Sequence, residues 1–199
     1  ARGVAGSDGT LVRVRLWDRG VRIFHWALVA FVTASWLLGE FGPPIMTLHF
    51  WSGYAICALL GFRLIWGLVG PKPARFSHFL ARPGRVVAYA RRLGERRPSY
   101  WAGHNPLGGW AVAALLLLLA ALAGTGLIAD PDDFVNVGPL ADLVSPEWRR
   151  WAVGWHHRIG TLLLALVALH VAAVLFYWAW KREDLIRPMI DGWKIVRRE

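Results

Sequence analysis

Four histidines carry the chemistry that the residue types and spacing of this sequence allow. His156 and His170 lie fourteen residues apart within one apolar run. An α-helix turns by about 100° per residue, so these side chains share one helix face and are separated by ~21 Å of helix. Ionisable residues in a membrane span are rare and usually functional, because hydrocarbon does not solvate them. Two imidazoles on one face, one near each side of a bilayer, indicate ligands for two stacked cofactors.

His25 and His49 can supply the second imidazole at each level. Each lies near the beginning of its own apolar run. With four spans of alternating direction, His25 reaches the depth of His170, and His49 reaches the depth of His156. Helical bundles commonly hold cofactors between facing helices. We therefore expect two haems, each held by a pair of neutral imidazoles: His25 with His170, and His49 with His156.

Other metal sites fit the sequence less well. A structural zinc site needs four ligands close together, and the sequence shows no cluster of cysteine, histidine and carboxylate residues. A copper site remains an alternative. It lacks a thiolate or methionine-rich ligand set, since Met46 and Met189 lie outside the expected bundle centre. Cys57 is the single cysteine and no CxxCH motif is present, so any haem is held noncovalently. A lone histidine is usually a core residue bonded to a carbonyl, but four at matched depths favour ligands.

These histidines belong to a chain with the composition of a membrane protein. Hydrophobic residues make up 56% of the sequence, and 13 of its 199 residues are tryptophan, which indicates lipid as the solvent. Four apolar runs are long enough to cross a bilayer: 21–41, 47–70, 107–129 and 155–181. A helix starting at 145–147 precedes the fourth run, and 83–93 is expected to be a short helix among lipid headgroups. The sequence predicts an all-α, four-helix transmembrane bundle.

The distribution of charge gives the expected orientation. The net charge is +10, and most of the 23 lysines and arginines lie in the N-terminal segment, the 71–105 connection and the C-terminal segment. Basic loops stay in the cytoplasm, so the N-terminus and the C-terminus are both expected to be cytoplasmic. We divide the chain into a cytoplasmic tail at 1–20, a di-haem bundle at 21–181 and a cytoplasmic tail at 182–199. The same pattern argues against a nucleic-acid partner.

Four further residues are candidates for contacts with cofactors. Gly53 and Gly160 each follow a ligand histidine by four residues and would leave room for a flat porphyrin edge, while close helix–helix packing explains them equally well. Arg63 lies at the expected depth of the cytoplasmic haem and would pair with a propionate, the alternative being a side chain that snorkels to the interface. His104, at the start of the third span, could relay a proton or contact a quinone headgroup, or be a solvated loop residue.

Five motifs give the chain a resemblance to a known family. They are WDRGVRIFHW at 17–26, LHFWSGY at 48–54, FRLIWGLVGP at 62–71, GHNPLGG at 103–109 and the histidine-containing run at 156–170. In this combination the sequence resembles the bacterial cytochrome b561 family and its relatives, the cytochrome b subunits of nickel–iron hydrogenases. The resemblance implies a multi-pass protein of the bacterial inner membrane with haem b ligated by His25, His49, His156 and His170. The family often has an acid at the position of His157. This departure leaves open that His157, and not His156, is the ligand, but the helical phase argues against such a swap.

The resemblance also implies a function. Bis-histidine ligation saturates the iron, so electron transfer is favoured over oxygen binding. We expect an electron-transfer subunit that connects membrane quinone with a periplasmic c-type cytochrome or an oxidoreductase or hydrogenase subunit. A second hypothesis is a stand-alone superoxide:ubiquinone oxidoreductase, which needs a cationic external surface; the outer loops are net acidic, although Arg149, Arg150 and Arg158 cluster near the external haem. A third is a non-redox membrane anchor without cofactor.

Overall fold

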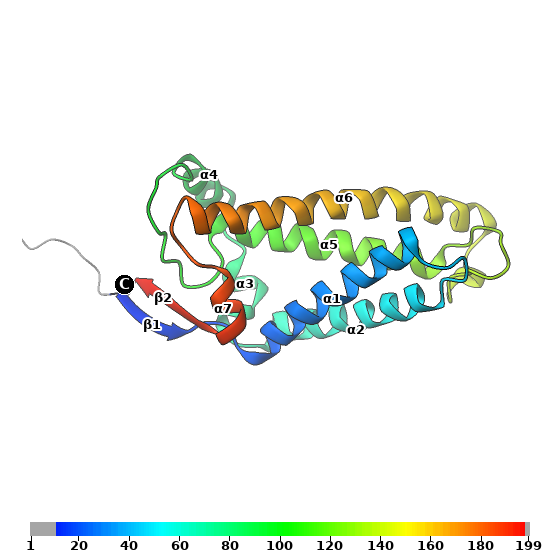
Figure 1. The fold of residues 1–199 in the computed structure, drawn as a ribbon, viewed down its shortest axis with the longest axis horizontal. Coiled ribbons are helices and arrows are strands. Elements are labelled where there is room, and N and C mark those ends of the chain that lie inside the picture. Colours follow the sequence, from blue (N-terminus) through cyan, green and yellow to red (C-terminus); the bar gives the residue numbers. More distant parts are fainter. Residues whose placement is uncertain (1–10, 198–199) are drawn as a thin grey trace, which may run out of the picture.

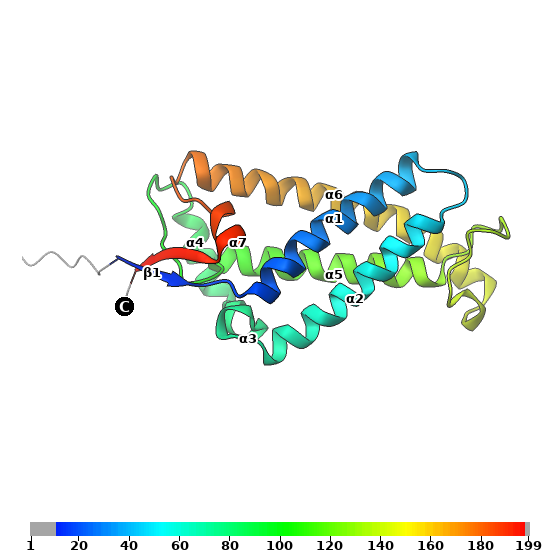
Figure 2. The same cartoon turned by 60° about the horizontal axis from the view of Figure 1, so that its bottom comes forward.

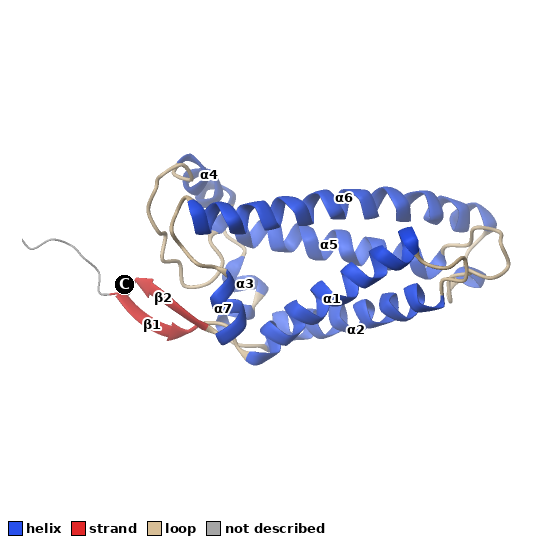
Figure 3. Cartoon of the chain, viewed as in Figure 1, coloured by secondary structure: helices blue, strands red, loops and turns tan. Residues whose placement is uncertain are grey.

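The computed structural model describes residues 11–197, most of which are helical (Figure 1, Figure 3). The four long helices are α1 (Arg19–Phe41), α2 (Thr47–Val69), α5 (Pro106–Ile128) and α6 (Pro146–Ala179). The shorter helices are α3 (Phe76–Phe79), α4 (Pro83–Arg91) and α7 (Ile186–Asp191), and single 3₁₀ turns occupy Lys72–Ala74 and Ala141–Leu143. Two strands, β1 (Leu11–Arg15) and β2 (Trp193–Arg197), complete the described chain.

The long helices confirm the predicted four-helix transmembrane bundle. Each is apolar and long enough to cross a membrane. Helices α1 and α2 form one hairpin, α5 and α6 form another, and the hairpins meet mainly between α2 and α5 (Figure 2). Many large apolar side chains point outward, because lipid is as apolar as the side chains themselves and does not drive them inward.

Helix α6 is longer than the predicted fourth span. The helix expected to start at 145–147 and the span expected at 155–181 form one helix of 34 residues. Pro146 stands at the first helical position, where its missing N–H has no role, and no further proline interrupts the segment. At ~1.5 Å per residue the helix is ~51 Å long, so it extends beyond a hydrocarbon core of ~30 Å.

A seven-residue spacing arranges the interior of the bundle in layers. The middle layer is a buried apolar cluster of Ile56, Leu119 and Leu163. Along α2, His49 precedes Ile56 by seven residues and Arg63 follows it by seven; along α6, His156 and His170 flank Leu163 in the same way. Residues seven apart share a helix face at ~10 Å along the axis. The polar residues therefore lie in two layers with an apolar layer between them.

The two ends of the bundle differ in what covers them (Figure 1). One end carries β1, β2, α3, α4 and α7, and we call it the terminal end. The opposite end carries the turn between α1 and α2 and the loop between α5 and α6, and we call it the loop end. The predicted orientation requires this grouping of the basic segments at one end. The side of the membrane that each end faces stays a prediction.

The terminal end contains a β-ribbon that the sequence analysis does not predict. β1 and β2 pair antiparallel, from Leu11 opposite Arg197 to Arg15 opposite Trp193. The strands lie near opposite ends of the sequence, so no local pattern reveals their pairing. The expected N-terminal tail is described only from residue 11, since residues 1–10 lie outside the described part. The chain continues from β1 into a buried cluster that covers this end of α1: Leu16, Trp17, Val21 and Ala74.

A buried ion pair fastens the C-terminal segment to the connection between α4 and α5. Lys194 Nζ lies 3.0 Å from Glu183 Oε1, and their side chains are 9% and 6% exposed. Glu183 Oε2 accepts hydrogen bonds from the backbone N–H and the hydroxyl of Ser99, at 2.8 and 2.7 Å. Burial alone would raise the pKa of Glu183, but Lys194 and the Ser99 donors outweigh it and hold this pKa below its ordinary value of 4.5.

Candidate functional site

The structure brings His49 and His156 together at the loop end. Their ring centroids are 6.1 Å apart and their ring planes are inclined by 76°. His49 comes from the first turn of α2, and His156 from α6, three turns after its beginning. Both side chains are half-buried. Two facing imidazoles from different hairpins therefore form the polar layer at this end.

Helix α1 orients the His49 ring. Nδ1 of His49 lies 2.8 Å from the carbonyl oxygen of Ser35 and 3.3 Å from its hydroxyl. Gly39 follows one turn later, and a Cβ there would lie 3.2 Å from His49 Cε1. Since the carbonyl only accepts, His49 Nδ1 carries the proton and donates it. This bond leaves Nε2 as the free ligand atom.

Helix α5 orients the His156 ring in the same manner. Nδ1 of His156 lies 3.0 Å from the carbonyl oxygen of Leu122 and 3.3 Å from the hydroxyl of Thr125. Gly126 again follows the accepting carbonyl by four residues, and a Cβ there would lie 3.0 Å from His156 Cε1. Each ring thus lies against a glycine of the neighbouring helix and donates to a carbonyl one turn before it. The two halves of the site are built alike.

The His49–His156 pair fits an iron atom with two axial imidazoles. Metal–imidazole bonds of ~2 Å on both sides leave the ring centres about 6 Å apart, and the observed separation is 6.1 Å. The Nδ1 bonds hold the tautomer that such ligation needs. Gly53 has nothing packed within 4 Å of the position of a Cβ, and Gly160 has only Leu122 Cδ1 at 3.8 Å. Close helix packing therefore does not explain these two glycines, and the room beside them fits a flat cofactor edge.

His25 and His170 lie in the half of the bundle nearer the terminal end. They are close enough that a positive charge on one would repel a positive charge on the other. Both side chains are half-buried. Nδ1 of His25 is buried and finds no hydrogen-bond partner in the described part of the chain. The protein therefore orients this pair less completely than the pair at the loop end.

Arg63 is buried at the level of His170. Its side chain is 5% exposed, and Nη2 donates a hydrogen bond of 3.0 Å to the carbonyl of Ala74. The guanidinium lies over the Phe76 ring at 4.7 Å and near the Phe79 ring at 5.7 Å. Arg63 therefore does not snorkel to the interface. Nη1 is buried without a hydrogen-bond partner among the described residues, and an unpaired buried donor of this kind needs an acceptor.

His104 lies beside the same group at the terminal end. Its ring packs against Trp17 and Phe79, with both centroids at 4.9 Å. Burial, followed by the nearby charge of Arg63, lowers the pKa of His104 to about 4, so the imidazole is neutral at physiological pH. Its Nδ1 is buried and also lacks a partner within the described chain. The alternative of a solvated loop histidine therefore does not hold.

Two other histidines lie apart from these layers. His157 is exposed although its neighbour His156 is half-buried, in agreement with the helical phase. His78, in α3, is also exposed. Among residues 11–197 no three histidine, cysteine or acidic residues are grouped so that they could hold a metal ion. The described chain therefore offers paired imidazoles and no zinc-like cluster.

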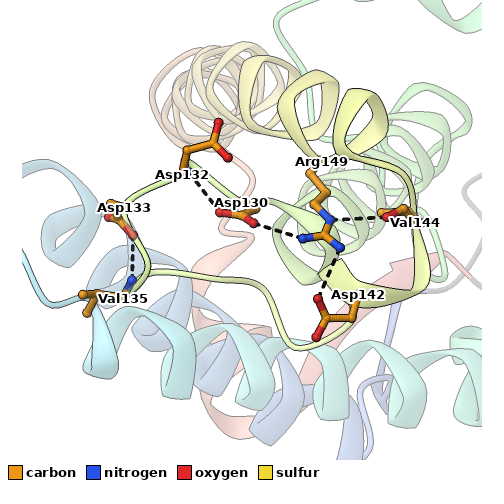
Figure 4. A network of polar contacts seen from close by, with 7 residues as sticks. All are labelled: Asp130, Asp132, Asp133, Val135, Asp142, Val144 and Arg149. Atoms are coloured by element: carbon orange, nitrogen blue, oxygen red, sulfur yellow. Dashed lines mark hydrogen bonds and ion pairs between the residues drawn. The ribbon is translucent and has the colours of Figure 1, made fainter.

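Arg149 at the loop end is engaged with acids. Its guanidinium lies 3.3 Å from Asp130 and 3.2 Å from Asp142, and Nε donates to the carbonyl of Val144 at 3.3 Å (Figure 4). Arg158 lies over the Trp155 ring at 5.5 Å. One of the three arginines that the sequence places near the expected external haem is therefore neutralised by two carboxylates. The cationic surface that superoxide would need is weakened accordingly.

The sequence analysis misses the residues that orient the loop-end histidines. Gly39 and Gly126 make room for the rings, and the carbonyls of Ser35 and Leu122 accept their protons. For Gly39 a signal was present, because it follows His25 by fourteen residues in the same helix. For Gly126 the sequence has no such signal. Glycine alone does not say which ring it faces, so only the tertiary structure assigns these roles.

Comparison with known proteins assigns the chain to a family. The chain matches the model of the family described as prokaryotic cytochrome b561 over residues 16–192. It is 25% identical to a probable Ni/Fe-hydrogenase B-type cytochrome subunit of Azotobacter chroococcum mcd 1, covering 92% of this chain and 89% of that protein. It is 24% identical, with the same coverage, to the protein of that name from Azotobacter vinelandii.

A third relative of the same name, from Bradyrhizobium diazoefficiens, is 22% identical over 90% of this chain and 85% of its own. No solved structure matches the chain. The family model covers the four spans, all four paired histidines and the α7 segment. The chain therefore belongs to the prokaryotic cytochrome b561 family and is a membrane protein that binds b-type haem and transfers electrons.

Proposed function

We propose that this chain holds two haem b groups and connects membrane quinone with a periplasmic redox partner in a bacterial inner membrane. The observation that carries the proposal is the layering of the bundle. His49 with His156 and His25 with His170 lie at two levels, separated by the apolar layer around Ile56. When bound, each haem supplies a one-electron redox centre. Two such centres at different depths would connect the faces of the membrane.

The histidines determine what each site can do. Two axial imidazoles fill the coordination of an iron atom, so the sites suit outer-sphere electron transfer and leave no position for oxygen. At the loop end the Nδ1–H groups donate to the Ser35 and Leu122 carbonyls, which fixes the rings and raises the basicity of the ligating nitrogens. At the terminal end Arg63 offers Nη1 to a haem propionate. Gly53 and Gly160 leave room for the porphyrin edge.

The loop end is the proposed contact for the periplasmic partner. Large apolar side chains are exposed there: Phe134 at 96%, Leu143 at 77% and Trp148 at 56%. Asn136 holds their loop to the α1–α2 turn, since it accepts from the Met46 N–H at 2.9 Å and donates to the Pro44 carbonyl at 2.8 Å. Exposed side chains on a fixed loop, bordered by acids at 130–133, suit a partner with an apolar patch and basic surroundings.

The names of the relatives suggest the class of partner. Three relatives are named as cytochrome subunits of Ni/Fe-hydrogenases, so a hydrogenase subunit is a candidate beside a c-type cytochrome. The superoxide:ubiquinone alternative is less supported, because Arg149 is paired with Asp130 and Asp142. The terminal end, which the positive-inside rule places in the cytoplasm, is the proposed side of quinone exchange.

Reconstitution tests the proposed function. The protein is purified, its haem content is determined, and it is placed in liposomes with a water-soluble quinol analogue. We expect two haems per chain, both six-coordinate and low-spin, which the quinol reduces and an added redox partner reoxidises. A protein whose haems are not reduced by quinol would contradict the proposal. Rapid consumption of superoxide without any partner would instead favour the second hypothesis.

A further inference from the structure

Two buried nitrogen atoms at the terminal end have no hydrogen-bond partner among residues 11–197, and both lie beside the same aromatic ring. They are Nη1 of Arg63 and Nδ1 of His104. The Arg63 guanidinium carbon is 5.7 Å from the Phe79 centroid, and the His104 ring is 4.9 Å from it. Arg63 lies close enough to His104 for its charge to lower the pKa of the imidazole. Two buried polar atoms beside one ring, each without a partner in the described chain, can be satisfied by one shared acceptor when His104 carries its proton on Nδ1.

Arg63 is held in place before any ligand arrives. Ala74 accepts from Nη2, and Phe76 stacks on the guanidinium. Phe76 reaches this position because Gly67, one turn after Arg63, has no side chain; a Cβ there would lie 2.0 Å from the Phe76 ring. A fixed guanidinium loses little conformational entropy when it binds an anion. Nη1, the donor atom without a partner among the described residues, is therefore available to bind an anion.

His104 is held with equal firmness. Trp17 and Phe79 pack on its ring, and Gly103 before it has a φ of +122°, a backbone conformation that favours glycine. The beginning of α5 approaches α3 so closely that a Cβ on Gly109 would lie 2.3 Å from the Phe79 carbonyl oxygen. The local backbone and the two aromatic rings therefore hold the His104 imidazole in one position. A neutral imidazole carries its proton on one ring nitrogen. With that proton on Nδ1, His104 serves as a donor and adds no second charge.

The guanidinium also lacks an adequate counter-charge. Asp18 is the acid whose charge reaches Arg63, but its carboxylate already caps α1 through the Val21 N–H and accepts from Trp66. The other residues whose charge would act on His104 are Lys194, His170 and His25, and none of them is an acid. A buried cation without a hydrogen-bonded anion is unfavourable. The acceptor that satisfies both donors best is a carboxylate.

We infer that His104 and Arg63 together bind a propionate of the haem held by His25 and His170. This inference rests on the proposed function and deepens it, because it gives His104 a role at the same site. Nη1 of Arg63 supplies the charge-assisted hydrogen bond, and Nδ1–H of His104 supplies a neutral second one. His104 is a cofactor-binding residue on this account and not a proton relay.

The experiment compares His104→Leu with His78→Leu, which removes an exposed histidine nearby. Haem content, the two midpoint potentials and the propionate bending band in the resonance Raman spectrum are measured on the full chain. With His104→Leu, we expect two haems to remain, one potential to fall and the propionate band to shift, because an uncompensated carboxylate favours ferric iron. With His78→Leu, all three readouts should equal those of the parent.

A second variant keeps the test decisive if His104→Leu does not fold. His104→Phe then takes its place, because it keeps a ring against Trp17 and Phe79 but has no N–H donor. His104→Gln retains an N–H donor, so its potentials and Raman band should lie nearer the parent than those of His104→Phe. Two intact haems with unchanged potentials and an unchanged band in the variant without a donor would overturn the inference alone. A parent protein without two bis-histidine haems would overturn the proposed function, and this inference with it.

Discussion

His49 and His156 face each other across the bundle at 6.1 Å, and each donates its Nδ1 proton to a carbonyl of a different neighbouring helix. The orientation of the His49 ring depends on α1, and that of the His156 ring depends on α5. The site therefore couples the orientation of two rings to the packing of both hairpins. A change on α1 or α5 should alter the ligand field at the loop end without touching a ligand.

Replacing single histidines should separate ligands from their neighbours. His156→Ala and His170→Ala should each remove one haem, and with it about half of the haem absorbance, because each iron loses an axial nitrogen. His157→Ala should keep both haems, since the His157 side chain is exposed. Haem content per chain and the low-spin signals in electron paramagnetic resonance are the measurements. Loss of a haem from His157→Ala alone would reverse the ligand assignment.

Gly126→Ala should disturb only the loop-end haem. The new Cβ would lie 3.0 Å from the His156 ring, which cannot move freely because it is bonded to the Leu122 carbonyl. Overpacking of this kind costs about 1 kcal/mol or more, so we expect a weaker loop-end haem and a shifted potential. Gly124→Ala is the matched control on the same helix, since nothing lies within 4 Å of its Cβ position. Equal behaviour of the two variants would contradict the role of Gly126.

Gly53→Leu should test whether a cofactor edge occupies the room beside α2. The chain leaves this position open within 4 Å, so the folded protein without haem should tolerate the larger side chain. A porphyrin edge at this position would clash with it, and the loop-end haem should then be lost or displaced. Haem content and thermal stability measured with and without haem distinguish the cases. Full haem content in Gly53→Leu would remove Gly53 from the cofactor-binding residues.

The buried Glu183–Lys194 pair should stabilise the terminal end in a pH-dependent manner. The pKa of Glu183 is lowered in the folded protein, so its contribution is complete above the ordinary value of 4.5 and is lost as the pH falls below it. Lys194→Ala leaves a buried carboxylate without its cation and should cost about 3 kcal/mol. Thermal unfolding in detergent across this pH range is the measurement.

A paired substitution provides the control for that prediction. Glu183→Gln combined with Lys194→Met removes both charges, and the double variant should be more stable than Lys194→Ala alone because no charge stays buried. Its stability should also lose the dependence on pH near 4. A parent protein whose stability does not fall on acidification would show that the pair contributes little.

Phe134→Ser should weaken binding of the proposed periplasmic partner and leave the haems intact. The Phe134 side chain is 96% exposed, so it has no role in the core that its loss would reveal. A central aromatic contact in an interface often contributes about 2 kcal/mol, or roughly thirtyfold in affinity. The rate of partner reduction at varied partner concentration is the measurement, with Leu68→Ser on the lipid-facing side of α2 as control. An unchanged concentration dependence would place the docking surface elsewhere.

Much of the bundle follows from the sequence because lipid imposes a simple rule. A span must be apolar and must satisfy its own backbone hydrogen bonds, so the four helices α1, α2, α5 and α6 are visible as runs of apolar residues. The fourteen-residue spacing of His156 and His170 likewise determines that they share a face, because helix geometry is local. The short helix α4 likewise forms within the expected segment 83–93, where apolar residues lie among arginines; its place among lipid headgroups stays a prediction.

Other features depend on contacts between segments distant in the chain. The β-ribbon pairs the two ends of the chain, and Lys194 reaches Glu183 only after the C-terminal segment folds back. Likewise Gly39 and Gly126 gain their roles from rings on other helices. None of these contacts has a periodic signal in the sequence, since each depends on which distant segments meet and not on the amphipathic pattern of one helix.

The sequence by itself therefore determined the spans, the levels of the four histidines and the expectation that they act in pairs. Only the tertiary structure decided how the loop-end imidazoles are oriented, that Arg63 turns inward instead of snorkelling, and that His104 joins it beside Phe79. The physical reason is the range of the forces. Helix phase and hydrophobicity act within one segment, whereas hydrogen-bond partners and close packing are set by which segments meet.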